Sequence, residues 1–139
     1  MTVRTFARLF GIVFLIVGVA GFIPGLTDMT HDHPDVTMDA GLGLELGLFP
    51  VNVLHNVVHL AFGAWGLAAS RSAGASRGYG KAVAVIYALL AVMGLIEGGN
   101  LWTTFGLIPL YGHDVWLHAL LAAVAAYFGF VHRERGAEA

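Results

Sequence analysis

Basic and acidic residues alternate between the gaps that separate four apolar stretches of this chain. All seven basic residues fall into three clusters, which precede the first stretch, separate the second from the third, and follow the fourth. Seven of the nine acidic residues fall into the other two gaps. Cytoplasmic flanks of membrane helices collect Lys and Arg, so the pattern predicts four membrane spans with both termini in the cytoplasm. The basic residues are Arg4, Arg8, Arg71, Arg77, Lys81, Arg133 and Arg135.

The composition agrees with a membrane protein. The chain is 58% hydrophobic and 12% charged, and its 139 residues leave room for one domain, residues 1–139. A span needs about 17 to 25 residues, and the expected spans are residues 6–23, 51–69, 79–96 and 115–131. The lipid bilayer is the expected partner. A net charge of −2 argues against nucleic acid, and the absence of Cys excludes disulfides and thiolate metal sites.

An internal repeat relates the two halves of the chain. The run Gly-Leu-Phe-Pro that ends at Pro50 recurs as Gly-Leu-Ile-Pro ending at Pro109, and a His follows nine residues after each Pro. Five residues after each Pro stands His55 in the first copy and Asp114 in the second. Two hairpins that run in the same direction form a parallel repeat. We therefore expect an all-α, four-helix transmembrane bundle built from two parallel hairpin repeats, with the N and C termini cytoplasmic.

The first apolar stretch also fits a second interpretation. Basic residues followed by an apolar run and small residues describe a cleavable signal peptide. Residues 11–25 align with residues 84–98 of the third stretch, and cleavage would remove one partner of this pairing. We therefore expect the first stretch to remain as a membrane helix.

The prolines and the segments before them are expected to mark the outer surface. Proline is tolerated in the first turn of a helix, so Pro50 and Pro109 are predicted to begin spans two and four. Residues 42–48 alternate Leu with Gly or Glu, and residues 100–112 contain Trp, Phe and Tyr, which favour the membrane interface. Both segments are predicted to form short interfacial helices or re-entrant turns, with ordinary loops as the alternative.

Polar side chains concentrate in the outer half of the predicted bundle. His55 and His59 share one face of span two, and Asp114 and His118 share one face of span four. Ionisable groups within a membrane face the bundle interior and suggest a functional site. Imidazole and carboxylate together suit Zn, Fe, Mn or Cu ions. These four residues are therefore a candidate metal site, and Asn52, Asn56 and Glu97 are expected to complete a polar layer around it.

Other interpretations of the same layer stay open. His59 and His118 could be axial ligands of a b-type haem, for which the small residues below them leave space. Alternatively, the layer could be architectural, with its His, Asn and Asp side chains bonded across the bundle to fix helix register. A proton or solute path is weaker, because the inner half contains no Asp, Glu, His or Lys before the basic clusters. We expect the architectural role, with metal or haem binding as the alternative.

The outer loop between spans one and two is rich in Asp and His over residues 27–39. Metal capture by this loop is conceivable, but a solvated acidic loop needs no ligand. The sequence contains no phosphate-binding loop, zinc-protease pair or hydrolase triad. It gives no indication of an enzyme.

Residues 46–70, together with residues 4–26 and 106–122, resemble a bacterial four-span membrane family catalogued only as a domain of unknown function. The segments FPVN-x2-HN-x2-HL and DVWLH carry this resemblance. It implies a small multi-pass protein of the bacterial cytoplasmic membrane, with no established activity. Its motif positions are Asn52, His55, Asn56, His59, Asp114 and His118. We expect a structural or accessory membrane component, which could act as a homo-oligomer or within a larger membrane complex.

Overall fold

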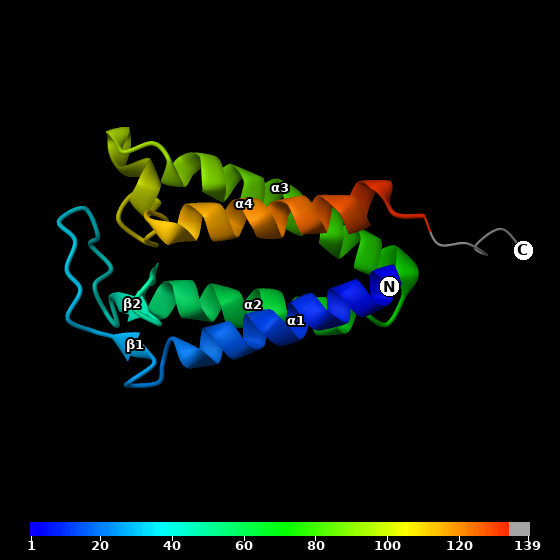
Figure 1. The fold of residues 1–139 in the computed structure, drawn as a ribbon, viewed down its shortest axis with the longest axis horizontal. Coiled ribbons are helices and arrows are strands. Elements are labelled where there is room, and N and C mark those ends of the chain that lie inside the picture. The colour runs from blue at the N-terminus through cyan, green and yellow to red at the C-terminus, as the bar shows by residue number, and fades with distance from the viewer. Residues whose placement is uncertain (134–139) are drawn as a thin grey trace, which may run out of the picture.

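The structure is a computed structural model that describes residues 1–133, and these residues are mostly helical (Figure 1). Within this range the helices are α1 (Val3–Ala20), α2 (Val53–Ala69), α3 (Ala73–Gly94), the 3-10 helix η1 (Gly98–Thr103), α4 (His113–Ala126) and the π-helical turn η2 (Tyr127–Val131). Arg135, on which the predicted charge pattern partly depends, lies outside the described residues.

Side-chain caps explain where three of the helices begin. Thr2, Asn52 and Ser72 accept hydrogen bonds from the backbone N–H groups three residues later, which satisfies a donor that the first helical turn leaves free. The Ser72 cap starts α3 at Ala73, six residues before the predicted span. The prediction that the prolines begin helices is wrong, because Pro50 precedes the Asn52 cap and Pro109 lies four residues before α4.

The segment between α1 and α2 contains a small sheet that an all-α fold does not include. Its strands are β1 (Thr27–Asp28), β2 (Gly43–Glu45) and β3 (Phe49–Val51), paired antiparallel in that order. Pro50 lies in an edge strand, where its missing N–H costs no ladder bond. Residues 42–48, predicted as an interfacial helix or turn, therefore form a strand and a tight turn.

This turn joins β2 to β3 through two residues with positive φ. Leu46 has φ 54° and Gly47 has φ 69°, and the Leu48 N–H donates to the Glu45 carbonyl at 3.1 Å. Hairpin turns use such left-handed residues because their twist matches that of the strands. Glycine adopts this conformation freely, whereas a leucine does so at a cost of about 1–2 kcal/mol. The conformation of Leu46 is therefore strained.

The four long helices form two hairpins, α1 with α2 and α3 with α4, which lie side by side (Figure 1). Within the first hairpin the backbones approach closely: a Cβ on Gly11 would lie 2.8 Å from Leu67 N and 2.9 Å from Gly63 O. In the second pair, a Cβ on Gly129 would lie 2.7 Å from Lys81 N. Glycines at these positions allow the close packing typical of membrane helices.

Large side chains fill the seam between the hairpins. Phe6 of α1 stacks on Phe128 of η2 with ring centroids 4.8 Å apart, and Phe14 lies 5.4 Å from Tyr87 of α3. All four rings are buried. The seam therefore depends on aromatic packing, whereas each hairpin depends on backbone contact.

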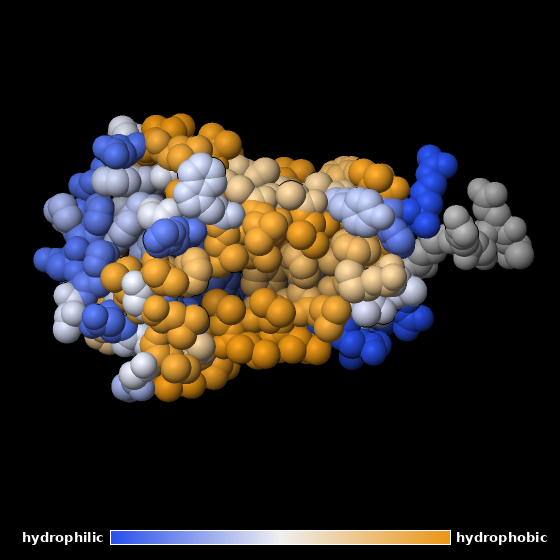
Figure 2. All heavy atoms as spheres, viewed as in Figure 1, coloured by the Kyte–Doolittle hydropathy of each residue, from blue (hydrophilic) through white to orange (hydrophobic). Residues whose placement is uncertain are grey.

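Exposed apolar side chains surround the middle of the molecule, and hydrophilic residues lie at its two ends (Figure 2). One end, here called the loop end, contains residues 21–52 and 95–112, and the other contains the N-terminus and the α2–α3 connection (Figure 1). Within residues 1–133, three helices are long and apolar enough to cross a membrane: α1, α3 and the continuous helix His113–Val131. The fourth, α2, is apolar but shorter. These helices indicate contact with a lipid bilayer.

The two copies of the predicted repeat share a local backbone conformation. Positive φ occurs at Leu46 and Gly47 in the first copy and at Phe105 and Gly106 in the second. In both copies, Leu and a buried Pro follow within three residues. The likeness is limited to these few residues. The pseudo-two-fold relation between whole hairpins stays a prediction.

Candidate metal centre

Rings from all four long helices meet in the half of the bundle nearest the loop end. The ring of His55 lies 4.4 Å from that of His59 and 6.1 Å from that of His118. Phe14 of α1 stacks on His59 at 5.8 Å, and Tyr87 of α3 lies 4.8 Å from His118. The histidines of α2 and α4 are therefore neighbours in the folded bundle.

The start of α2 is fixed by Asn52, which is fully buried. Its Oδ1 accepts from the His55 N–H at 2.8 Å. Its Nδ2 donates to the carbonyls of Met38 at 2.8 Å and Leu107 at 2.7 Å. One side chain thus caps α2, joins the two loop segments and sets the position of His55.

Asp114 and His118 form a local pair in the first turns of α4. The His118 Nδ1 lies 2.8 Å from the Asp114 carbonyl oxygen and 3.1 Å from the Asp114 Oδ2. A proton on Nδ1 is donated to the carbonyl, because a carbonyl oxygen only accepts. This tautomer leaves the lone pair of Nε2 available to a ligand.

Ligand atoms of His55, Asp114 and His118 all lie within 4.8 Å of one another, and the three side chains are buried. Ligands of one metal ion at about 2.0–2.2 Å lie roughly 3 to 4 Å apart. Modest side-chain rotations would therefore bring the three groups into one coordination sphere. We call these three residues the candidate metal centre, or metal centre for short.

The Nδ1 of His55 has no hydrogen-bond partner among the described residues, and the Asp114 Oδ2 lies 3.1 Å from the His118 Nδ1, whose N–H also donates to the Asp114 carbonyl. The backbone of Pro50 hydrogen-bonds the ring of His55. Buried polar groups are nearly always paired, so an orphaned nitrogen requires an explanation. An imidazole nitrogen and a carboxylate that lie this close together in a buried place are suited to hold a cation.

His59 is the fourth predicted metal ligand, and it lies between two cavities. One cavity, of about 90 Å³, is also lined by Glu45 and Asp114. The other, of about 180 Å³, is also lined by His55 and by the apolar side chains of α2, α3 and the 104–110 segment. His59 therefore adjoins the metal centre without belonging to the close group of three.

Glu45 lies beside the metal centre, whereas its segment, residues 42–48, was predicted to form an interfacial helix or re-entrant turn at the outer surface. Strand β2 directs it inward, where it is 5% exposed, and its Oε2 has no partner within residues 1–133. Burial, assisted by the charge of Asp114, raises the pKa of Glu45 to about 7. The period-two alternation of residues 42–48 was the signal for a strand, and a strand would have placed Glu45 opposite the leucines.

The rest of the predicted polar layer divides into distinct environments. Asn56 is buried and faces α1, where a Cβ on Gly21 would overlap its amide group. Asn52 is the cap described above. Glu97 is exposed just before η1 and lies apart from the metal centre.

The Asp- and His-rich loop packs onto the second loop segment. His31 Nε2 lies 2.9 Å from the Tyr111 hydroxyl, and the ring of His33 stacks on the same Tyr111 at 4.2 Å. Trp102 Nε1 donates to the Asp35 Oδ2 at 3.2 Å. In the described part of this loop, no group of ligands close enough for a metal ion is found. These contacts give the loop a packing role.

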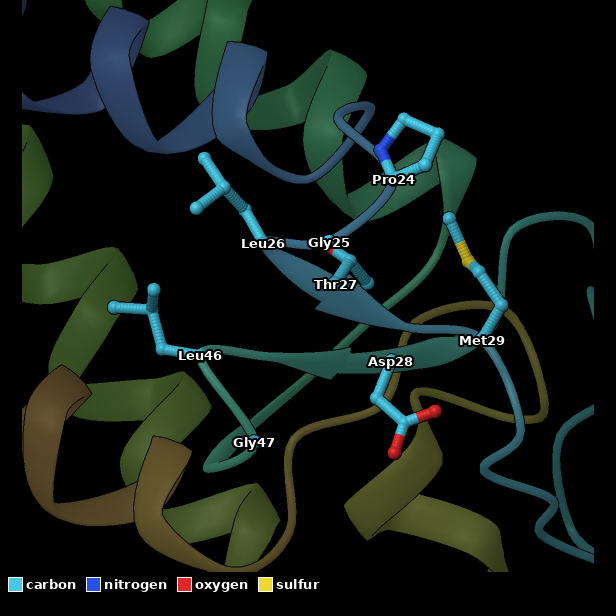
Figure 3. Close-up of a pocket in the computed structure, with 8 residues that line it drawn as sticks. All are labelled: Pro24, Gly25, Leu26, Thr27, Asp28, Met29, Leu46 and Gly47. Atoms are coloured by element: carbon cyan, nitrogen blue, oxygen red, sulfur yellow. The ribbon is translucent and has the colours of Figure 1, made fainter.

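An open pocket of about 660 Å³ lies at the loop end, between residues 24–29 and the β2–β3 turn (Figure 3). Its lining includes Asp28, Leu46 and Gly47. Leu46 also lines the cavity beside Glu45. The open pocket and the buried cavity are therefore neighbours.

Residues 4–131 of the chain match the model of a family described as a domain of unknown function (DUF4383). No curated protein and no solved structure matches the chain.

Proposed function

We propose, for a chain that belongs to the family described as a domain of unknown function (DUF4383), that His55, Asp114 and His118 bind a divalent transition-metal ion inside a membrane-spanning bundle. The observation that carries this proposal is the close group of ligand atoms of His55, Asp114 and His118, all within 4.8 Å of one another, in which His55 Nδ1 has no hydrogen-bond partner within residues 1–133. An ion would give this nitrogen a partner.

The comparison with Asn52 favours a ligand over a purely architectural layer. An architectural polar group uses its bonding capacity within the protein, and Asn52 makes three hydrogen bonds through its amide group. His55 lies almost as deep, yet its Nδ1 has no protein partner in the described range. An unmet buried polar atom costs about 1–3 kcal/mol, which a bound ion would offset.

The groups behind the proposed ligands also fit a metal site. A histidine that binds metal through one nitrogen almost always donates the other N–H to a carbonyl or carboxylate. His118 Nδ1 contacts the Asp114 carbonyl, and the backbone of Pro50 bonds the ring of His55. These contacts hold the ring orientations and leave one nitrogen of each ring for the ion.

The donor set selects a class of ion. Two imidazoles and one carboxylate with open positions suit Fe²⁺, Mn²⁺ or Zn²⁺. Haem fits less well, because sites for ligands of that kind are roughly 300–1,000 Å³, whereas the cavities beside His59 are about 180 and 90 Å³. We therefore assign His59 a place beside the ion rather than an axial haem position.

Metal content of the purified protein tests the proposal. The full chain, purified in detergent and loaded with Zn²⁺ or Co²⁺, should retain one equivalent after removal of free metal. Asp114→Asn and His118→Ala should lose it, whereas the matched control His31→Ala, in the loop that packs on Tyr111, should keep it. Folded wild-type protein that binds less than a tenth of an equivalent of either ion would refute the proposal.

We further propose that the helices cross the bacterial cytoplasmic membrane four times, with the loop end outside. The charge distribution supports this direction: basic residues cluster at the end that holds the N-terminus, and the acidic Asp28, Asp32 and Asp35 lie at the loop end. Because the chain has no Cys, single-cysteine variants give a clean test. An impermeant maleimide should label Met29→Cys in intact cells and Ala75→Cys only after lysis, and the reverse pattern would invert the topology.

A further inference from the structure

The cavity beside the metal centre is small, polar on one side and connected to it by a shared residue. It has a volume of about 90 Å³, and its ionisable lining consists of Glu45, His59 and Asp114. Asp114 is also a member of the metal centre. All three side chains are at least nine-tenths buried.

Polar atoms that line this cavity are without partners. Glu45 Oε2 and His59 Nδ1 have no hydrogen-bond partner in the described part of the chain. A carboxylate in an apolar bundle is costly unless a cation or a donor compensates it. These two atoms and the Asp114 carboxylate, which line one space, are therefore suited to receive a cation together with water.

The far side of the same cavity adjoins the solvent. Leu46 lines both this cavity and the open pocket at the loop end that Figure 3 shows. Its side chain is 63% exposed, and its φ of 54° is strained for leucine. Asp28, drawn in the same view, adds a carboxylate to the open pocket. Asp28 and Leu46 are exposed, whereas Glu45 and Asp114 are buried.

The second cavity does not offer such a path. Apart from His55, His59, Tyr87 and Thr104, its lining is aliphatic or aromatic: Val58, Phe62, Ile86, Leu90, Ile108 and Leu110. An apolar cavity of this size stays dry and does not favour a charged solute. Figure 2, in contrast, shows a small hydrophilic area in the hollow between the two hairpins, within the apolar belt.

We propose that the cavity lined by Glu45, His59 and Asp114 is the access route by which a divalent cation reaches the metal centre from the loop end, with Glu45 as its transient ligand. This inference rests on the proposed metal site and adds how that site is filled. The ion passes the Leu46 turn and exchanges water for the Glu45 carboxylate and the His59 imidazole. It then moves to Asp114, His55 and His118.

The volumes are consistent with a partly hydrated ion. Water takes about 30 Å³ per molecule in the liquid, so a cavity of about 90 Å³ holds an ion with a few waters. The carboxylates of Glu45 and Asp114 together balance the charge of one divalent cation. A step halfway along the route therefore avoids full dehydration of the ion before it reaches its final ligands.

Loading kinetics test the route. The metal-free full chain in detergent is mixed with Co²⁺, and the visible absorption of the bound ion is followed in a stopped-flow instrument. Glu45→Gln should slow loading at least tenfold while the final spectrum and stoichiometry stay those of wild type. Leu46→Gly, which fits the positive φ and removes the side chain at the boundary, should accelerate loading at least threefold. The matched control Leu48→Ala, on the same turn but outside the cavity lining, should load at the wild-type rate.

Four outcomes would overturn this assignment. If Glu45→Gln loads within twofold of wild type, the route does not pass Glu45. If Glu45→Gln abolishes the final Co²⁺ spectrum in folded protein, Glu45 is a ligand of the metal centre rather than a transient one. If Glu45→Gln does not fold, the Leu46→Gly variant is used, and a rate of Co²⁺ loading equal to that of wild type would contradict the route. If wild type binds no Co²⁺, the proposed function fails and the route fails with it.

Discussion

Replacement of Asn52 by Ala should destabilise the protein far more than loss of an ordinary helix cap. Asn52 is fully buried and makes three hydrogen bonds, to the His55 N–H and to the carbonyls of Met38 and Leu107. An alanine removes all three bonds. It also detaches the start of α2 from both loop segments.

The size of this effect follows from the bonds lost. Loss of an N-cap costs about 1 kcal/mol, and each of two carbonyls deprived of a buried donor adds about 1–2 kcal/mol. We expect Asn52→Ala to lower the free energy of unfolding by about 3–5 kcal/mol. Ser72→Ala is the matched control, because the Ser72 hydroxyl caps α3 through one exposed bond to the Ala75 N–H, and it should cost about 1 kcal/mol.

A second substitution separates the contribution of the helix cap from that of the two hydrogen bonds by which Asn52 connects the loop segments. Asp is as good an N-cap as Asn, but its carboxylate cannot donate to the carbonyls of Met38 and Leu107. Asn52→Asp should therefore be at least as destabilising as Asn52→Ala. Circular dichroism during a titration with SDS in mixed micelles measures all three variants. If Asn52→Asp keeps the stability of wild type, or if Asn52→Ala lowers the free energy of unfolding no more than Ser72→Ala does, the bonds to the Met38 and Leu107 carbonyls contribute little.

Three further predictions follow from the packing and the charges. In the same titration, Gly11→Ala should lower the free energy of unfolding by about 1–3 kcal/mol, because its Cβ would lie 2.8 Å from the backbone of α2. The control Gly78→Ala, whose Cβ would have no described neighbour within 4 Å, should leave this free energy unchanged or raise it. The pKa of Glu45 rises from an ordinary 4.5 to about 7, so the metal-free folded state binds more protons than the unfolded state between these values. The free energy of unfolding should fall as pH rises from 4.5 to about 7, by up to about 3 kcal/mol, and Glu45→Gln should flatten this dependence. Tyr111→Phe should loosen the outer loop by removing its bond to His31, seen as faster amide exchange there with little change in overall stability.

Hydropathy and charge predicted the long helices because their signals extend over whole segments. The four predicted stretches overlap α1, α2, α3 and α4. The boundaries were less accurate, since single caps set them: Ser72 begins α3 six residues before the predicted span, and the Asn52 cap, rather than Pro50, begins α2. A cap is one side chain, and composition over a window cannot distinguish it from any other polar residue.

The candidate site was partly predictable for the same reason. Regular helical spacing placed His55 with His59 and Asp114 with His118, and the fold brings His55, Asp114 and His118 together. Glu45 was missed because its position depends on a tight turn and a short strand, in which it points inward while Leu46 is exposed. Glu97 illustrates the opposite case: it lies near the end of α3 in sequence, but the turn after Gly94 leaves it exposed.

The contrast between glycine contacts within the hairpins and ring contacts between them has a mechanical consequence. Backbones in contact at Gly11 and Gly129 leave little space for the helices of one hairpin to shift against each other, whereas the seam between the hairpins is made of ring contacts such as Phe6 on Phe128. Because His55 comes from one hairpin and Asp114 with His118 from the other, any shift along the seam would change the spacing of these three side chains.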